Sequence, residues 1–391
     1  MPLLLDLSHT SHTRARTGVQ RVARALYREL GPRAVPICFD PYEAAWRGLE
    51  PFEVNNLAAA DPSAGRGAHW PFAARLKGRL RRLTSRPGPS TDVAGEPSGV
   101  LVPEIFSPLV GAALPKILST ASGPRVALFH DAIVLQYPEL SPRATVARFP
   151  AYLRELLQFD GVAAVSESSR AALLDYWKWL GVPSMPEVAA IPLGIDPPPA
   201  SKETARSAAI PTVLCVGSIE GRKNQAALLD ACESLWSGGA RFELRLIGLA
   251  NKETGGATLE RIRQLSSAGR PVRYEGPADD AALEEAYRDC DFTVYPSIAE
   301  GFGLPVAESL ARGRACLCRM EGALGEVARG GGCVDLGRAS PAEIAAAMGL
   351  LLGSPAKVAA LESEARARRF KTWAVYADEL LGWMGTLRRN P

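Results

Sequence analysis

Short apolar runs alternate along the chain with segments of helical periodicity. In the first half, runs of strand length cover Leu3–Leu7, Val126–Phe129 and Val162–Val165, and helical spacing of apolar residues covers Val19–Leu30, Val146–Leu157 and Ser169–Leu180. Continuous apolar runs indicate strands that are buried on both faces. Strands that alternate with helices predict a parallel sheet covered by helices.

The same alternation starts again after residue 211. The predicted strands there are Val213–Val216, Leu244–Ile247, Val272–Tyr274, Phe292–Tyr295 and Ala315–Cys318, and the predicted helices are Gln225–Trp236, Leu259–Ser267, Ala281–Tyr287 and Pro305–Ala311, followed by a mostly helical tail from Pro341. The stretch 191–211 is rich in Pro, Ala and Ser and is typical of a linker. A chain of 391 residues suits two domains. We therefore expect two α/β domains, at 1–200 and 201–370, and a final helix over 371–391.

Residues 61–99 interrupt the first half with a stretch rich in Pro, Gly, Ser and Arg, which we interpret mostly as a long loop. Inside it, the segment Trp70–Arg86 places Phe72, Leu76, Leu80 and Leu83 on one helical stripe, among six basic residues and no acidic ones. One interpretation is a helix that contacts an anionic membrane surface or guides a lipid-linked acceptor. The other is an exposed, partly disordered loop, since Gly78 weakens a helix and Pro87 ends one.

Composition excludes several classes of protein. Apolar residues make up 47% of the chain, charged residues 22%, and the net charge is +3, so no overall field favours nucleic acid. The sequence has no apolar stretch long enough for a transmembrane helix, and its start lacks the basic region of a signal peptide. Its seven scattered cysteines indicate reduced thiols, so we expect a cytoplasmic protein. We interpret Cys316 and Cys318 as core residues and expect no metal site.

The segment Phe292–Glu308 is the most informative for chemistry. Its strand runs into the loop Ser297–Gly303, and Pro305 suits the start of a helix. Glycines at 301 and 303 let the backbone approach a ligand, and the helix start offers N–H groups to a phosphate. The carboxylates of Glu300 and Glu308 can each accept from two hydroxyls of a sugar. The alternative is a glycine-containing turn followed by a Glu that answers the helix dipole.

A second strand-end loop follows Val213–Val216 and contains Gly217, Arg222 and Lys223. Basic residues at a helix N-terminus oppose its dipole unless an anion compensates them. A diphosphate is a suitable anion, and Arg offers it a bidentate fork. The alternative is a pair of solvated surface cations.

Two further positions in the first half are candidates. His130 follows the run Val126–Phe129 and lies at the carboxyl end of that strand, as a ligand-facing or a structural residue. Gly18 opens the first predicted helix, where it allows close approach of a ligand or simply makes a turn. The pair Asp289/Asp291 resembles a metal-binding motif of another transferase fold, but it spans a helix end and a strand start, so we assign it no metal.

Taken together, these motifs resemble glycosyltransferase family 4, whose members are retaining enzymes with the GT-B fold. The resemblance covers nearly the whole chain and rests on several segments in order: 17–21, His130-Asp131 with 137–139, 165–169, 191–196, 216–224 and 295–308 with its paired glutamates. The chain departs from the family at Ser218, where many members carry Arg, and residues 61–99 have no counterpart. A match of six segments in order is specific.

The resemblance implies two Rossmann-like domains facing each other across a cleft, with the helix at 371–391 returning to the first domain. It implies transfer of a hexose from a UDP-sugar or GDP-sugar to a glycan or lipid-linked acceptor, with retention, no cofactor and no metal, in bacterial polysaccharide or glycoconjugate assembly at the inner face of the membrane. His130, Glu300, Arg222 and Lys223 would then be catalytic. The donor-binding residues would be Gly18, Gly217, Ser297, Gly301, Phe302, Gly303, Leu304 and Glu308, with Glu308 on the ribose.

Rival functions use similar clefts, because a fold does not determine a function. A sugar phosphorylase would need a pyridoxal-binding Lys, which the sequence does not identify, and a nucleotide-sugar epimerase is a second enzymatic alternative. The non-enzymatic alternative is a catalytically weak sugar-nucleotide-binding partner protein. The presence of His130, Lys223, Glu300 and Glu308 favours the enzyme.

Overall fold

The computed structural model describes residues 2–59, 61–62, 65, 67–84, 96–196, 198 and 210–388. Contacts within the chain group it into two compact units. Unit 1 comprises Met1–Asp131, Ala147–Leu193 and Trp373–Pro391, and unit 2 comprises Ala132–Val146 and Gly194–Thr372. The boundary expected at residue 200 and most of the expected linker lie outside the described residues.

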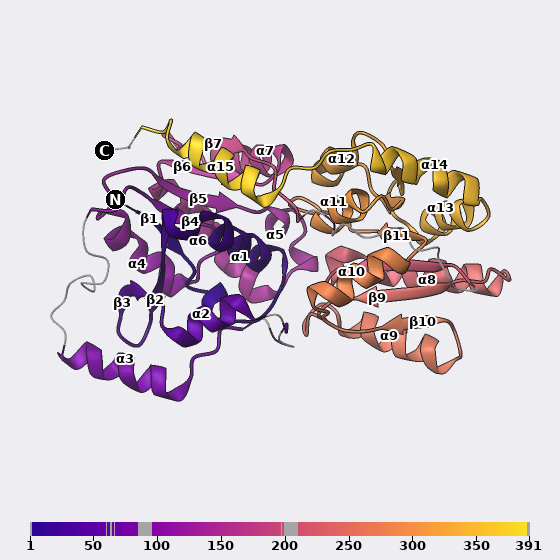
Figure 1. Cartoon of the computed structure of the whole chain (residues 1–391), viewed down its shortest axis with the longest axis horizontal. Coiled ribbons are helices and arrows are strands. Elements are labelled where there is room, and N and C mark those ends of the chain that lie inside the picture. The colour runs from indigo at the N-terminus through magenta and orange to yellow at the C-terminus, as the bar shows by residue number, and fades with distance from the viewer. Residues whose placement is uncertain are drawn as a thin grey trace. The chain divides into compact units, whose positions relative to one another are not determined.

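Unit 1 is built on a seven-stranded sheet with the order β3-β2-β1-β4-β5-β6-β7 (Figure 1). Its strands are β1 (Leu3–Asp6), β2 (Ala34–Asp40), β3 (Ala45–Gly48), β4 (Val100–Val102), β5 (Arg125–Phe129), β6 (Gly161–Ala164) and β7 (Glu187–Ala190). All neighbouring pairs are parallel except β2 and β3, which form an antiparallel hairpin at one edge.

The helices of unit 1 follow the strands in the alternation expected from the sequence. They are α1 (Gly18–Leu30), α2 (Pro51–Ala58), α3 (Phe72–Thr84), α4 (Pro108–Leu118), the later part of α6 (Arg143–Glu155), α7 (Glu167–Trp179) and α15 (Trp373–Met384). The last of these packs against α1, and Arg33 pairs with Asp378 at 2.6 Å (Figure 1). Trp383 Nε1 also donates to Glu187 at the start of β7, at 2.8 Å.

Unit 2 contains a six-stranded, fully parallel sheet with the order β10-β9-β8-β11-β12-β13. Its strands are β8 (Thr212–Val216), β9 (Glu243–Ile247), β10 (Val272–Tyr274), β11 (Phe292–Tyr295), β12 (Cys316–Cys318) and β13 (Cys333–Asp335). Its main helices are α8 (Gln225–Ser237), α9 (Gly256–Ser267), α10 (Asp280–Asp289), α11 (Leu304–Ala311), α12 (Gly322–Ala328), α13 (Pro341–Leu352) and α14 (Pro355–Arg366). The five strands predicted for this half and the expected α/β fold class are confirmed.

Strand order reverses once in each sheet. From β1 the chain builds β2 and β3 on one side and then β4 to β7 on the other, and from β8 it builds β9 and β10 before β11 to β13. Loops at the carboxyl ends of the two strands that flank such a reversal diverge, and ligands of open α/β sheets bind there. Ligand sites are therefore expected at the carboxyl ends of β1 and β4 in unit 1 and of β8 and β11 in unit 2.

The segment expected to be mostly loop at residues 61–99 contains the helix α3. Phe72–Thr84 is helical, in agreement with the predicted stripe, while Arg86 lies outside the described residues. Trp70, the first residue of the segment that was interpreted as a membrane-contacting helix or an exposed loop, is buried, and its ring stacks on His12 at a centroid distance of 3.8 Å. Within the described chain, no single helix is long and apolar enough to span a bilayer; only α13 and α14 taken together pass on length and composition, and they are bent by 96°.

Candidate functional site

The loops after β8 and β11 meet because these strands are neighbours in the sheet, with Val213 opposite Phe292. The β8 loop carries Arg222 and Lys223 in a short 3-10 helix, Gly221–Lys223, directly before α8. Lys223 Nζ lies 2.5 Å from Glu300 Oε1, and Arg222 Nη1 lies 2.8 Å from Glu300 Oε2. The structure thus brings together three residues of unit 2 that the sequence singled out.

The anion that both cations share in the structure is the carboxylate of Glu300. The sequence analysis named a bound diphosphate or solvent as the surroundings of these cations and did not foresee Glu300, because it did not predict that the two loops are adjacent. Burial by itself would raise the pKa of Glu300, but the charges of Lys223 and Arg222 outweigh it and lower that pKa to about 2. Glu300 is therefore ionised at neutral pH, and Arg222 remains 26% exposed at the site.

Glycines shape the floor of the β8 loop. Gly217 has a φ of +149° and its N–H donates to Ile247 at 2.9 Å. Gly248, directly after β9, has a φ of +151°, and a Cβ there would lie 2.0 Å from the Gly217 carbonyl oxygen. The sequence analysis did not name Gly248, although its place directly after an apolar run was a signal. A side chain at this position is incompatible with the observed packing of the two loops.

The β11 loop is held from both sides. Ile298 N donates to the Arg222 carbonyl at 2.8 Å, and Arg319 Nη1 donates to the Ile298 carbonyl at 2.6 Å. Ser297 is buried and hydrogen-bonds to Glu300. Arg319 follows β12 and was not predicted, since a single Arg after a strand carries no motif. These contacts fix the backbone from which Glu300 projects.

Helix α11 begins directly beyond this loop. Its N-cap, Gly303, has a φ of +102°, and a Cβ there would lie 2.8 Å from the side chain of Leu324. Gly301 and Phe302 precede it in the loop, and Leu304 is the first helical residue. Glu308 is buried one turn further on, where its carboxylate accepts a hydrogen bond from Tyr287 at 3.4 Å.

In unit 1, His130 follows β5 and is buried. Its Nε2 lies 2.8 Å from the Pro103 carbonyl oxygen, so this nitrogen carries the proton, because a carbonyl only accepts. Burial lowers the pKa of His130, which keeps the ring neutral. Gly18, the other predicted site residue of this unit, is the exposed first residue of α1, with open space around it.

The strand reversal in unit 1 carries residues that the sequence analysis missed. Glu104, two residues after β4, is buried and accepts from His9 N at 2.9 Å and from Thr10 N at 2.8 Å. At the end of β1, burial and the nearby charge of Glu104 raise the pKa of Asp6 to about 7. The signal for both was a carboxylate close behind an apolar run, a weak pattern without knowledge of the strand order.

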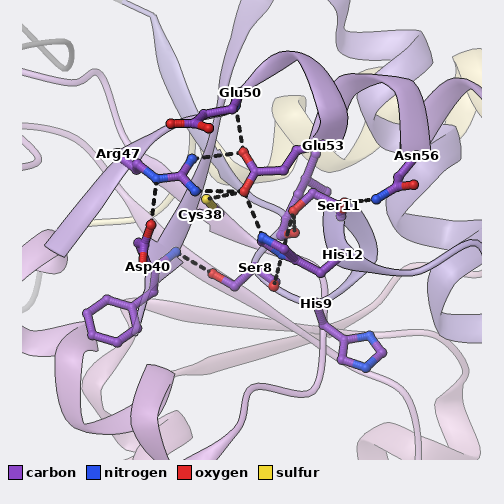
Figure 2. A network of polar contacts seen from close by, with 12 residues as sticks. Ser8, His9, Ser11, His12, Cys38, Asp40, Arg47, Glu50, Glu53 and Asn56 are labelled. Carbon is purple, nitrogen blue, oxygen red and sulfur yellow. Dashed lines mark hydrogen bonds and ion pairs between the residues drawn. The ribbon is translucent and has the colours of Figure 1, made fainter. Parts of the chain in front are cut away.

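A buried ionic network supports the loop after β1 (Figure 2). Arg47 lies between Asp40, at 3.0 Å, and Glu53, at 2.8 Å. Glu53 in turn holds His12 Nε2 at 2.7 Å, and His12 Nδ1 lies 2.9 Å from the Ser8 carbonyl oxygen. The loop that borders the strand reversal is therefore anchored by buried charges as well as by the Trp70 ring that stacks on His12.

Two groups of side chains in the described residues have the geometry to hold a metal ion. One is Cys316, Cys318 and Cys333; the first two are buried, as the core interpretation expected, and Cys333 from the unpredicted strand β13 joins them. The other is His12, Cys38 and Glu53, where Arg47 already occupies the carboxylate.

Asp291 lies at the amino end of β11, the opposite end from Glu300, and its carboxylate accepts from Thr212 N at 2.8 Å.

Residues 210–354 match the protein family described as "Glycosyl transferases group 1". This range begins just before β8 and ends after α13, so it covers the whole sheet of unit 2 and the loops with Arg222, Lys223 and Glu300.

Among curated proteins, the chain is similar to the serotype-specific mannosyltransferase WbdA of Escherichia coli, at 25% identity over 328 residues, 78% of this chain. The chain spans only 37% of the length of that protein. It is also similar to the O-antigen chain mannosyltransferase B of Escherichia coli, at 27% identity over 54% of this chain and 56% of that protein.

Among solved structures, the chain is similar to Anabaena HepE, which was crystallised with UDP and glucose. The TM-score is 0.71 at 17% identity, and the match covers 99% of this chain and 100% of HepE. This likeness shows the fold, which is the GT-B type expected from the sequence.

Proposed function

We propose that the chain is a retaining, metal-independent glycosyltransferase that moves a hexose from a nucleotide-diphosphate sugar to a hydroxyl acceptor. The observation that carries this proposal is the group Arg222, Lys223 and Glu300 at the strand reversal of unit 2. It joins two cations, a carboxylate and a helix N-terminus within one domain of the glycosyl transferases group 1. The assembly of a polysaccharide or glycoconjugate is proposed from the mannosyltransferase relatives.

The diphosphate of the donor is assigned to Arg222, Lys223 and the backbone of the two loops. Fixed positive charge at a leaving group is worth most in the transition state, where negative charge grows on the departing oxygen. In this proposal Glu300 holds the two cations in place and accepts from the hydroxyls of the donor sugar, while Glu308 binds the ribose. UDP-glucose is the first donor to test, because a HepE structure holds it, and nucleotide-activated mannose is the second, because the curated relatives are mannosyltransferases.

Retention follows in this proposal from a front-face displacement. The bond from the anomeric carbon to the diphosphate oxygen breaks as the acceptor oxygen bonds to the same face, and the acceptor proton passes to the departing diphosphate oxygen. Glu300 is a poor nucleophile for a covalent route, since two ion pairs hold its oxygens. His130, neutral and with Nε2–H bound to Pro103, is assigned to the sugar near the reacting centre.

The acceptor is assigned to unit 1, as a glycan or a lipid-linked glycan at the inner face of the cytoplasmic membrane. The strand reversal of this unit supports the assignment, because Ser8, His9 and Glu104 surround the ends of β1 and β4. A carboxylate, an imidazole and a hydroxyl suit the hydroxyl groups of a sugar.

The donor is identified by a thermal-shift screen of the full chain against UDP-, GDP- and ADP-sugars, since a ligand that binds only the folded state raises the melting temperature. We expect one nucleotide class to raise it and to release nucleoside diphosphate slowly without an acceptor. A shift without any release, even with glycan acceptors added, would identify a binding protein instead. No shift with any nucleotide sugar contradicts the proposal.

A further inference from the structure

Helix α3 packs on unit 1 through its smallest residues and turns its large apolar side chains outward. Ala74 and Gly78 are buried, and a Cβ at Gly78 would lie 2.9 Å from Tyr42 Cβ. The opposite face carries a stripe of four large side chains, here called the outer stripe, with exposed fractions of 79%, 48%, 54% and 83% for Phe72, Leu76, Leu80 and Leu83. Helical periodicity places these four on one side. The glycine that weakens an isolated helix is the point of close contact here.

The basic residues of α3 divide between its two borders. On one border, Lys77 pairs with Glu50 at 2.7 Å and Arg81 with Glu43 at 3.5 Å, which ties the helix to unit 1. On the other border lie the exposed arginines Arg75, Arg79 and Arg82. None of these three has a carboxylate partner in the part of the chain that the structure describes, and α3 itself contains no acidic residue.

We propose that the outer stripe inserts into the surface of an anionic bilayer, with Arg75, Arg79 and Arg82 on the lipid headgroups. A helix with a strongly apolar face and a cationic border lies in the membrane interface, and each basic residue near an anionic surface strengthens binding about five-fold. The positive charge along the border of α3 favours an anionic bilayer over a second copy of the protein. A second copy of α3 would bring arginines against arginines, whereas anionic headgroups complement them.

The same helix is joined to the loop at the strand reversal of unit 1. His69 N donates to the His12 carbonyl at 2.7 Å, and the Trp70 ring, two residues before α3, stacks on the His12 ring. His12 Nδ1 contacts the Ser8 carbonyl at 2.9 Å, as Figure 2 shows. Docking of α3 would therefore hold this loop near the headgroups, where a lipid-linked acceptor lies; this last step rests on the proposed function, whereas the docking does not.

The test is sedimentation of the full chain with vesicles of phosphatidylcholine alone and of phosphatidylcholine mixed equally with phosphatidylglycerol. We expect the protein to pellet with the anionic vesicles at low salt, and binding to weaken as salt rises. Absence of binding to anionic vesicles at low salt overturns the proposal. Because this assay needs no sugar transfer, its failure is distinct from a failure of the proposed function.

Two variants separate the two features of the helix. Each of Arg79 and Arg82 is expected to raise the affinity for anionic vesicles about five-fold. Replacing both by Gln should therefore weaken that affinity by about 25-fold. Replacing Leu76, Leu80 and Leu83 by Ser removes the inserted apolar face and should abolish binding to the anionic vesicles. The control is Leu109→Ser, another exposed leucine of unit 1, which should bind as the parent does. Parent-like binding of the leucine triple variant, or a dimer that this variant dissolves, refutes bilayer docking.

Discussion

At the scale of single residues, the candidate site is a cluster of charges in which the cations are paired with carboxylates of the same unit. Glu300 neutralises Lys223 and Arg222 across two loops, and Arg222 also contacts Glu220 at 2.9 Å. In the proposed function, a bound diphosphate would compete with Glu300 for the two cations without displacing it. The sequence identified all three residues by their places at strand ends. It could not reveal their pairing, which depends on β8 and β11 being neighbours.

We predict that Glu300→Gln lowers the rate of sugar transfer about 10²–10³-fold, as removal of a group that organises transition-state charge does. The same change should destabilise the fold by about 3 kcal/mol at neutral pH, because the folded-state pKa of about 2 lies below the ordinary 4.5. This contribution is present above the unfolded pKa and is lost as the pH falls through the folded pKa. Urea unfolding should therefore show a smaller difference between parent and variant in acid than at neutral pH. A difference that does not change with pH would mean that the ion pairs do not form.

Asp6 makes the opposite prediction for pH dependence. Its pKa is raised from 3.8 to about 7 by burial and by Glu104, so the folded state holds its proton more tightly than the unfolded state. Stability from this group is complete below the unfolded pKa and is lost as the pH rises toward the folded pKa. In the parent, Ser8 N donates to the Asp6 carboxylate at 2.9 Å. The amide oxygen of Asp6→Asn can accept the same hydrogen bond, and the variant avoids the cost of burying an ionised group. Melting temperatures should show the variant gaining on the parent as the pH rises from about 4 to about 7, between the unfolded and folded pKa values. A constant gap refutes the raised pKa.

At the scale of elements, prediction succeeded where a strand is a continuous apolar run. The strands of unit 2 from β8 to β12 lie within one residue of their predicted bounds. Strands β8, β11 and β12 are almost continuously buried, whereas β9 and β10 alternate buried apolar residues with the more exposed Arg245 and Arg273. Strand β4 was missed because it directly follows the segment 61–99 that was interpreted as loop, and β13 because it follows three glycines and is only partly buried. Edge strand β7 begins with an exposed Glu187, and β2 contains Pro36, so neither resembles a core strand.

The packing of the β8 and β9 loops makes a sharp prediction. Gly248→Ala would place a Cβ 2.0 Å from the Gly217 oxygen at a φ of +151°, so the loops must separate. We expect a loss of unfolding free energy of about 1–3 kcal/mol or more and a weaker affinity for nucleotide. The matched control is Gly256→Ala at the start of α9, where nothing lies within 4 Å. Chemical denaturation measures both; equal stabilities of the two variants would show that the loops do not pack as described.

At the scale of the whole molecule, alternation of strands and helices was enough to predict two α/β domains. The strand order was not predictable, because local periodicity carries no information on which strands pair. That order determines which loops converge, and it explains why Glu104 and Asp6 in unit 1, and Gly248 and Arg319 in unit 2, were missed. The motif residues were found because they combine rare types, paired Glu, adjacent Arg-Lys and a lone His, with glycines after strands.

The central claim is that Arg222 and Lys223 neutralise the leaving diphosphate of a sugar nucleotide without a metal and with retention. Proton NMR of an α-linked donor, followed during turnover in EDTA with the parent and with Lys223→Ala, tests each part of it. The account predicts that the parent consumes the donor, that the sugar first appears in the α configuration, and that the variant is about 10²–10³-fold slower. A first product in the β configuration, turnover that appears only after Mn²⁺ or Mg²⁺ is added, or equal rates for the two proteins would contradict it.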